Sequence, residues 1–193
     1  FFKESSLSNG EFMIGIPGTV GGAIKMNAGA YGWEFSELLK DLRCFNLETF
    51  EIETLKKEEL EFSYRKSKNL DNKIILSATL IVEKGDQQII DKNLSAFNEK
   101  RKKSQPAAIY NAGSVFKNTN EYYAGELIDN AGLKGYEIDG VSVSKKHANF
   151  FVAKKGAKAI SLFELVQYVK DKVATKFGVI LEEEIIFIGD FTK

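Results

Sequence analysis

The sequence predicts an α+β protein, because strand-like and helical hydrophobic patterns occupy different parts of the chain. Residues 1–85 are mainly β in character: DLRCFNL (41–47) and FEIETL (50–55) are typical of a hairpin, and KIILSATLIVEKG (73–85) of a long strand. Between residues 86 and 103 apolar side chains recur at near-helical spacing. The basic run KRKK (100–103) closes this predicted helix and suggests a domain boundary, although basic side chains are also favoured at helix C-termini.

A second unit of mixed helices and strands follows the boundary. Residues 111–117 predict a loop and strand, residues 122–131 a short helix stopped by Gly132, and HANFFVAKKG (147–156) a strand. Ser161 and Glu164 form a capping-box pattern before an amphipathic helix that stops at Gly178. The last segment, VILEEEIIFIG (179–189), reads as a closing strand.

Composition excludes several classes of protein. Twenty-seven basic residues balance 27 acidic ones, so the charge field that drives nucleic-acid binding is missing. No apolar run approaches the ~20 residues that span a bilayer, and no signal segment opens the chain. With one cysteine, Cys44, and one histidine, His147, neither a disulfide framework nor a protein-built metal site is expected. We therefore expect a cytoplasmic protein that binds no membrane, no nucleic acid and no metal, and His147 as a local hydrogen-bonding residue.

A glycine-rich segment is the strongest local signal for a ligand. Seven of the 16 glycines lie between Gly10 and Gly32. Such a cluster is useful where φ is positive or where a ligand approaches the backbone closely, as around phosphates. The spacing matches neither a dinucleotide fingerprint nor a P-loop. A flavin or a sugar nucleotide remains possible, and so does a run of tight turns that binds nothing.

Two isolated residues are candidates for chemistry, each with a plain structural alternative. Arg65, beside Tyr64, has the guanidinium fork that suits a carboxylate or phosphate, or it is a solvated residue at a strand entrance. Ser114 has no histidine partner for a nucleophilic triad. Its hydroxyl is a weak acid that can protonate only a strong base such as an enolate, with Lys117 easing the transfer; otherwise it is a turn residue.

Three consecutive glutamates, 182–184, interrupt the apolar closing segment. Because side chains alternate between the two faces of a strand, at least one carboxylate could point inward, where it would need a partner. The alternative is a charged edge strand that prevents aggregation.

Five motifs occur in a recognisable order: GIPGTVGGAIKMNAGAYG, FSYRKS, NAGSVFKN, AGLKGYEIDGVSVSKKHANF and LEEEIIFIG. In this order they resemble the UDP-N-acetylenolpyruvoylglucosamine reductase family, also called UDP-N-acetylmuramate dehydrogenases. The resemblance implies an oxidoreductase in which NADPH reduces a noncovalent FAD, and the flavin reduces UDP-N-acetylglucosamine enolpyruvate. It implies a role in peptidoglycan synthesis, and so in cell-wall biogenesis, cell shape and division, and a monomer.

The same resemblance assigns roles to individual residues. Ser114 corresponds to the family's proton donor, and Arg65 and Glu184 to the groups that stabilise the enolic intermediate. Tyr64, Lys117 and Asn118 lie where the family approaches its substrate. The FAD contacts fall on Gly15, Ile16, Pro17, Gly18, Thr19, Val20, Gly21 and Gly22, and on Asn27, Ala28, Gly29 and Ala30.

The resemblance also divides the chain. It implies a partial FAD-binding region of the PCMH (vanillyl-alcohol-oxidase-like) type at 1–98, an α+β substrate-binding domain at 99–180, and a closing strand at 181–193 that returns to the FAD-binding region. A first FAD-binding subdomain is expected upstream of Phe1. Thr119, Asp139 and Ala153 depart from the family pattern, at none of the three catalytic positions. A fragment that only binds the UDP-sugar, or another flavin oxidoreductase of the same superfamily, are the alternatives.

Overall fold

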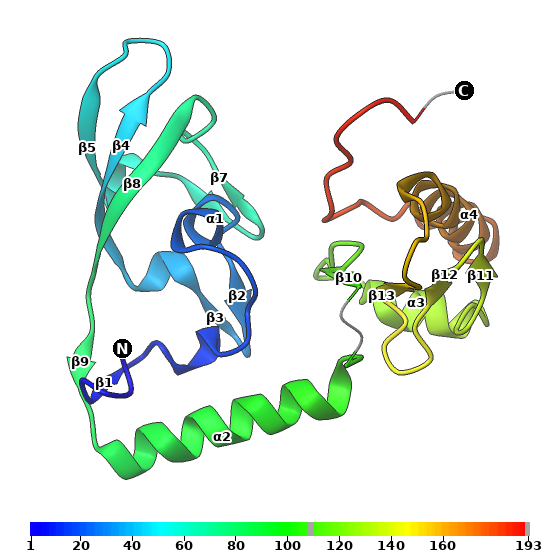
Figure 1. Cartoon of the computed structure of the whole chain (residues 1–193), viewed down its shortest axis with the longest axis horizontal. Helices are drawn as coiled ribbons and strands as arrows, with labels where there is room; N and C mark the ends of the chain where they lie inside the picture. Colours follow the sequence, from blue (N-terminus) through cyan, green and yellow to red (C-terminus); the bar gives the residue numbers. More distant parts are fainter. Residues whose placement is uncertain (108–109, 192–193) are drawn as a thin grey trace. The chain divides into compact units, whose positions relative to one another are not determined.

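The computed structural model describes residues 1–107 and 110–191, which form two compact units, 1–101 and 102–193. Strands and helices mix in both units, and this confirms the α+β class (Figure 1). No helix in the described ranges is long and apolar enough to cross a membrane. Each unit is described by itself.

Unit 1 is built on a three-stranded antiparallel sheet in the order β5-β4-β8. Its strands are β4 (Leu39–Asn46), β5 (Ile52–Lys56) and β8 (Lys73–Leu80), which confirms the predicted hairpin. The predicted long strand ends at Leu80, and the chain pairs again only at β9 (Glu83–Lys84) with β1 (Leu7–Ser8).

Smaller elements surround this sheet. They are α1 (Val20–Lys25), the paired strands β2 (Gly29–Ala30) and β3 (Trp33–Glu34), the paired strands β6 (Phe62–Ser63) and β7 (Lys66–Ser67), and the 3-10 turns Glu11–Met13, Phe35–Glu37 and Lys57–Glu59. The predicted helix at 86–103 is confirmed as α2 (Gln87–Ser104). The Tyr31 ring stacks on the Phe97 ring of α2 at 4.4 Å, and the Tyr31 hydroxyl donates to the Phe97 carbonyl.

The core of unit 1 lies between α1 and one face of the sheet. Leu39, Leu42 and Cys44 are buried on β4, and Ile24 of α1 and Phe35 pack against them, together with Leu60 and Leu70. Burying each such aliphatic side chain contributes about 1.5–3 kcal/mol. This core holds the glycine-rich segment beside the sheet.

Asn27 fixes the turn that follows α1. It is fully buried, and its φ of +42° lies in the left-handed region, which asparagine tolerates better than most residues. Its Nδ2 donates to Glu34 Oε2 and to the Ser63 carbonyl, and its Oδ1 accepts from the Ser36 amide at 3.0 Å. One side chain thus ties the turn to β6 and to the Phe35–Glu37 turn.

Unit 2 has a four-stranded antiparallel sheet in the order β10-β13-β12-β11 and two helices. The strands are β10 (Asn111–Ser114), β11 (Glu137–Ile138), β12 (Val141–Val143) and β13 (Phe150–Ala153), and the helices are α3 (Ala124–Asn130) and α4 (Ala159–Phe177). The strand predicted in 147–156 and the helix predicted at 122–131 are confirmed as β13 and α3.

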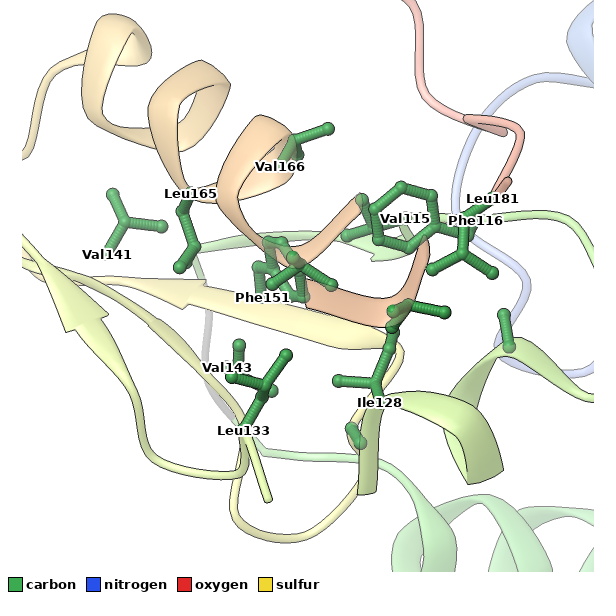
Figure 2. Close-up of a cluster of buried hydrophobic side chains, with 14 residues drawn as sticks. Val115, Phe116, Ile128, Leu133, Val141, Val143, Phe151, Leu165, Val166 and Leu181 are labelled. Atoms are coloured by element: carbon green, nitrogen blue, oxygen red, sulfur yellow. The ribbon is translucent and has the colours of Figure 1, made fainter. Parts of the chain in front are cut away.

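Side chains from every part of unit 2 meet in one core (Figure 2). Val141 and Phe151 come from the sheet, Leu165 from α4 and Ile128 from α3. Val115, Phe116 and Leu181 join the same cluster from outside the regular elements. The segments on either side of the candidate catalytic residues are therefore anchored in the core.

Two predictions for unit 2 are wrong at the level of local structure. Lys158, in extended conformation, precedes the first turn of α4, so Ser161 lies buried inside the helix and is not its cap. The helix does end at Gly178, whose φ of +69° is left-handed. The closing segment 179–189 is not a regular strand; it makes one isolated β-bridge, between Glu183 and Phe116.

His147 lies in the tight loop before β13, as a local hydrogen-bonding residue. Its Nδ1 accepts from the Asn149 amide at 3.3 Å, and its carbonyl accepts from the Phe150 amide. Burial lowers the pKa of the imidazole, and the positive charge of Lys134 lowers it further. The folded loop therefore requires the neutral ring.

Replacing Asn27 with alanine is expected to destabilise unit 1 by about 2–4 kcal/mol, because the buried Ser36 amide and the Ser63 carbonyl lose their partner and φ stays positive. Asn27→Gly removes the same hydrogen bonds without the backbone strain, so it should recover about 1 kcal/mol of that loss. Urea unfolding of both variants measures the difference. Equal stabilities for the two variants would contradict the role of the left-handed backbone.

Folding stability should fall as the pH drops below about 6.5, the usual imidazole pKa. Because the folded pKa of His147 is lowered, the unfolded chain binds the proton more readily, and stability rises with pH through this range. His147→Gln should flatten this part of the pH dependence relative to the wild type. Identical slopes of unfolding free energy between about pH 5 and 7 in both proteins would refute the assignment.

Candidate functional site

Ser114 closes β10 in unit 2, opposite Phe150 of β13. The register shifts between Asn111 and Ser114, where Gly113 adopts a φ of +80° and donates its amide to Asn111 Oδ1 at 3.0 Å. This irregular turn gives the half-buried Ser114 a backbone position unlike that of its neighbours on the strand. Bulges of this kind commonly re-aim a side chain next to a functional site.

The three glutamates lie directly beside the residues that follow Ser114. The Lys117 amide donates to the Glu182 carbonyl at 2.9 Å, and the Glu184 amide donates to the Val115 carbonyl at 2.8 Å. The structure thus pairs the residues that follow Ser114 with the segment that carries Glu184, although about 65 residues of sequence separate the two segments.

The three carboxylates differ in their surroundings. Glu182 is exposed and pairs with the Lys117 ammonium. Glu183 is three-quarters buried and pairs with Lys170 of α4 at 2.7 Å. Glu184 is half-buried. No carboxylate of the three is fully buried.

A polar cavity of about 320 Å³ lies in unit 2 and includes Asn118 in its lining. It is lined by Asn118, Tyr123, Gly125, Glu126, Asp129, Lys134, His147 and Ala148. Asn118, expected at the substrate from the sequence, also accepts the Ala124 amide at the start of α3 with its Oδ1. The sequence reasoning missed Tyr123 and Lys134, and it did not place His147 in a binding site.

Arg65 belongs to unit 1, in the two-residue turn between β6 and β7. Its φ is +54°, its Cζ lies 4.6 Å from the centroid of the Tyr64 ring, and its Nη2 donates to the Gly29 carbonyl at 3.1 Å. The guanidinium is therefore tied to the glycine-rich segment, 36 residues earlier in the chain. It is not simply a solvated side chain at a strand entrance.

The glycine-rich segment forms one wall of an apolar cavity of about 150 Å³ in unit 1. Of the residues expected to contact a cofactor, Ile16, Pro17, Gly18, Thr19, Val20 and Ala28 line it, together with Met13, Ala23 and Phe35. Gly18 has a φ of +121° and open space where a side chain would begin. Gly21 and Gly22 lie in α1, and the buried Asn27 serves the fold with its side chain.

Thr19 organises the mouth of this cavity. It precedes α1, and its Oγ1 accepts from the Gly22 amide at 3.1 Å. Backbone amides in the first turn of a helix have no carbonyl partner within that helix. In α1 the Thr19 side chain binds the Gly22 amide, and the amides of Val20 and Gly21 come before it in the same turn. Small residues, an apolar wall and backbone N–H groups at its edge can accept a flat ring system with polar edges.

Residues that could hold a metal ion are missing from the described ranges, in which histidine, cysteine, aspartate and glutamate form no cluster of three. The buried Cys44 thiol has a raised pKa, chiefly because of burial, and packs against Glu53. It belongs to the core of unit 1 and is not a reactive group.

Comparison with known proteins agrees with the motif order. A family model described as the C-terminal domain of UDP-N-acetylenolpyruvoylglucosamine reductase matches residues 105–188. The UDP-N-acetylenolpyruvoylglucosamine reductase of Lachnoclostridium phytofermentans is 42% identical over 189 residues, which are 97% of this chain and 60% of that protein. The protein of the same name from Fervidobacterium nodosum is 44% identical over 185 residues, 94% of this chain and 59% of that protein.

A solved structure shows the same fold. The crystal structure of UDP-N-acetylenolpyruvylglucosamine reductase from Thermus caldophilus matches 95% of this chain and 65% of its own, with a TM-score of 0.85 and 33% sequence identity. The chain spans about three fifths of the length of the curated relatives it matches. On this agreement in sequence and structure, the chain belongs to the UDP-N-acetylenolpyruvoylglucosamine reductase family.

Proposed function

We propose that this chain is the part of an NADPH-dependent, FAD-containing reductase that converts UDP-N-acetylglucosamine enolpyruvate to UDP-N-acetylmuramate for peptidoglycan synthesis. The observation that carries the proposal is the backbone pairing of the Ser114 segment with the Glu184 segment. In this pairing the residues that follow Ser114 run alongside the three glutamates, and Asn118, four residues after Ser114, lines the polar cavity. This proposal includes a cytoplasmic, monomeric enzyme and a PCMH-type FAD-binding region within 1–98, followed by a substrate domain.

The glycine-rich cavity suits the proposed flavin. Its lining combines apolar side chains with the small residues Gly18, Ala23 and Ala28, and it includes Thr19 and Val20 at the start of α1. FAD, when bound, supplies the hydride transfer from NADPH to the methylene carbon of the enolpyruvyl group. Gly15 through Gly22 and residues 27–30 are the positions that would hold it, with Arg65 attached to them through the Gly29 carbonyl.

Addition of hydride to the methylene carbon leaves the adjacent carbon as a carbanion, with its charge shared by the carboxylate as an enolate. In the proposed reaction the Ser114 O–H bond breaks, and its proton forms the new C–H bond at this carbon. The resulting serine oxygen is reprotonated from solvent. A hydroxyl is acidic enough for this step only because the enolate is a strong base.

Arg65 and Glu184 would stabilise the enolic intermediate, and Arg65 would do so as a cationic fork that hydrogen-bonds the enolic carboxylate. Removing one such preorganised donor typically costs about 3–4 kcal/mol in the transition state. Lys117 adds positive charge near Ser114, and its pairing with Glu182 holds the ammonium in place.

The polar cavity beside Asn118 suits the sugar nucleotide. Its lining has an ammonium at Lys134, a phenol at Tyr123 and the neutral ring of His147, which can donate through Nε2 because Nδ1 is already an acceptor. Glu126 and Asp129 line the same cavity, and Lys134 is paired with Asp129, so the lining offers hydrogen-bond donors and acceptors for the sugar and the base rather than an excess of positive charge for the pyrophosphate. Asn118 joins this cavity to the Ser114 strand.

Replacing Ser114 with alanine in the full-length enzyme should separate the two half-reactions. Reduction of the flavin by NADPH should keep its wild-type rate, whereas reoxidation by the enolpyruvyl substrate should slow by about 10²–10⁴-fold, the range for loss of a general acid. Stopped-flow absorbance of the flavin measures both steps. Ser142→Ala, which removes a hydroxyl from β12 of the same sheet, is the matched control.

Wild-type reoxidation rates in Ser114→Ala would refute the role given to Ser114. A wild-type protein that binds no flavin, or whose flavin is not reoxidised by the enolpyruvyl sugar nucleotide, would refute the proposed function itself.

A further inference from the structure

Asn149 pairs with the residues that follow Ser114, on the edge opposite residues 182–184. It is 1% exposed, in the turn just before β13. Its Oδ1 accepts from the Phe116 amide at 2.9 Å, and its Nδ2 donates to the Phe116 carbonyl at 2.8 Å. Its own carbonyl accepts from the Val115 amide at 2.8 Å. One residue therefore satisfies three backbone groups of the two residues directly after Ser114.

This pairing takes the place of a strand. β10 stops at Ser114 and β13 begins at Phe150, so no regular ladder reaches residues 115–117 from that side. The primary amide of Asn149 substitutes for a peptide group, because it carries one donor and one acceptor side by side. On the opposite edge the same residues pair with 182–184.

We call the hydrogen bonds of Asn149 to Val115 and Phe116 the clamp. The clamp also links the Ser114 segment to the cavity that contains Asn118. The backbone N–H of Asn149 donates to His147 Nδ1, and His147 lines the cavity that contains Asn118. Phe116, which Asn149 grips, lies between Ser114 and Asn118 in the chain, and its side chain is fully buried in the core of unit 2 (Figure 2). A shift of this residue would move the serine hydroxyl, the Glu184 segment and the cavity lining together.

We infer that Asn149 is a positioning residue for proton delivery: its hydrogen bonds fix the backbone register in which the residues after Ser114 pair with the Glu184 segment. The inference rests on the proposed function for its catalytic consequence, but the clamp itself can be tested without it. The side chain is enclosed in the core, so Asn149 acts through Ser114 and not on the substrate.

The test is Asn149→Asp in the full-length enzyme. An ionised aspartate still accepts from the Phe116 amide but repels the Phe116 carbonyl, whereas a protonated one donates and accepts as the amide does. We expect reoxidation of the flavin by substrate to slow by about 10–100-fold at neutral pH, the scale for a small misplacement of a reacting group. Flavin reduction by NADPH should change little, and the deficit in reoxidation should shrink as the pH falls.

Val173→Ala is the matched control, because it loosens the same core from α4 but removes no hydrogen bond of residues 115–117. Hydrogen exchange of the full-length protein, read at the Phe116 amide against amides of α4, measures the clamp independently of catalysis. Asn149→Asp should speed exchange at Phe116 selectively, and Val173→Ala should not. If Asn149→Asp does not fold, Asn149→Ser, which can satisfy only one of the two Phe116 groups, takes its place.

A substituted enzyme with wild-type reoxidation, or one whose slowing and exchange pattern match those of Val173→Ala, would overturn the inference. If the wild type failed to reduce the enolpyruvyl substrate, the proposed function would fall, while exchange at Phe116 would still decide whether the clamp exists.

Discussion

The two-sided pairing of residues 115–117 is the constraint on which the site in unit 2 depends. On one edge the amide of Asn149 bonds both backbone groups of Phe116, and on the other the Glu182 carbonyl and Glu184 amide bond Lys117 and Val115. Buried backbone groups must be paired, so neither neighbour can be removed without a cost of about 1–3 kcal/mol per orphaned group. The same bonds fix the backbone register between the residues that follow Ser114 and the segment that carries Glu184.

In unit 1, two residues in left-handed backbone turns hold neighbouring segments together through their side chains. Asn27 and Arg65 both have positive φ, and their side chains cross to neighbouring segments, Asn27 to Ser36 and Ser63 and Arg65 to the Gly29 carbonyl. The glycine-rich wall is thereby attached to the turn that carries the guanidinium. A flavin site and an enolate-stabilising group would be fixed by the same small set of hydrogen bonds.

The sequence predicts what depends on local periodicity. The helices α2 and α4, the hairpin β4–β5 and the stop at Gly178 follow from spacings of 3.6 and 2 and from one glycine. Features that depend on distant partners were missed or mistaken. Residues 179–189 have the composition of a strand, but within the described part of the chain their backbone pairs only with residues 115–117, and they form no regular strand. Ser161 has the pattern of a helix cap, but α4 begins one turn earlier, directly after Lys158. Asn149 and Lys134 both lie in the motif AGLKGYEIDGVSVSKKHANF, but the pattern does not reveal that Asn149 bonds Phe116, 33 residues earlier, or that Lys134 lines a cavity with His147. The order of the five motifs identified the catalytic candidates instead.

The central claim is that Ser114 and Glu184 act on one intermediate. A double-mutant cycle in the full-length enzyme, with Ser114→Ala, Glu184→Gln and the pair, tests it through kcat/KM for the enolpyruvyl sugar nucleotide. The account predicts a coupling free energy of at least about 1 kcal/mol, because each group depends on the other's position. Effects that add to within about 0.5 kcal/mol would show that the two residues work independently and would contradict it.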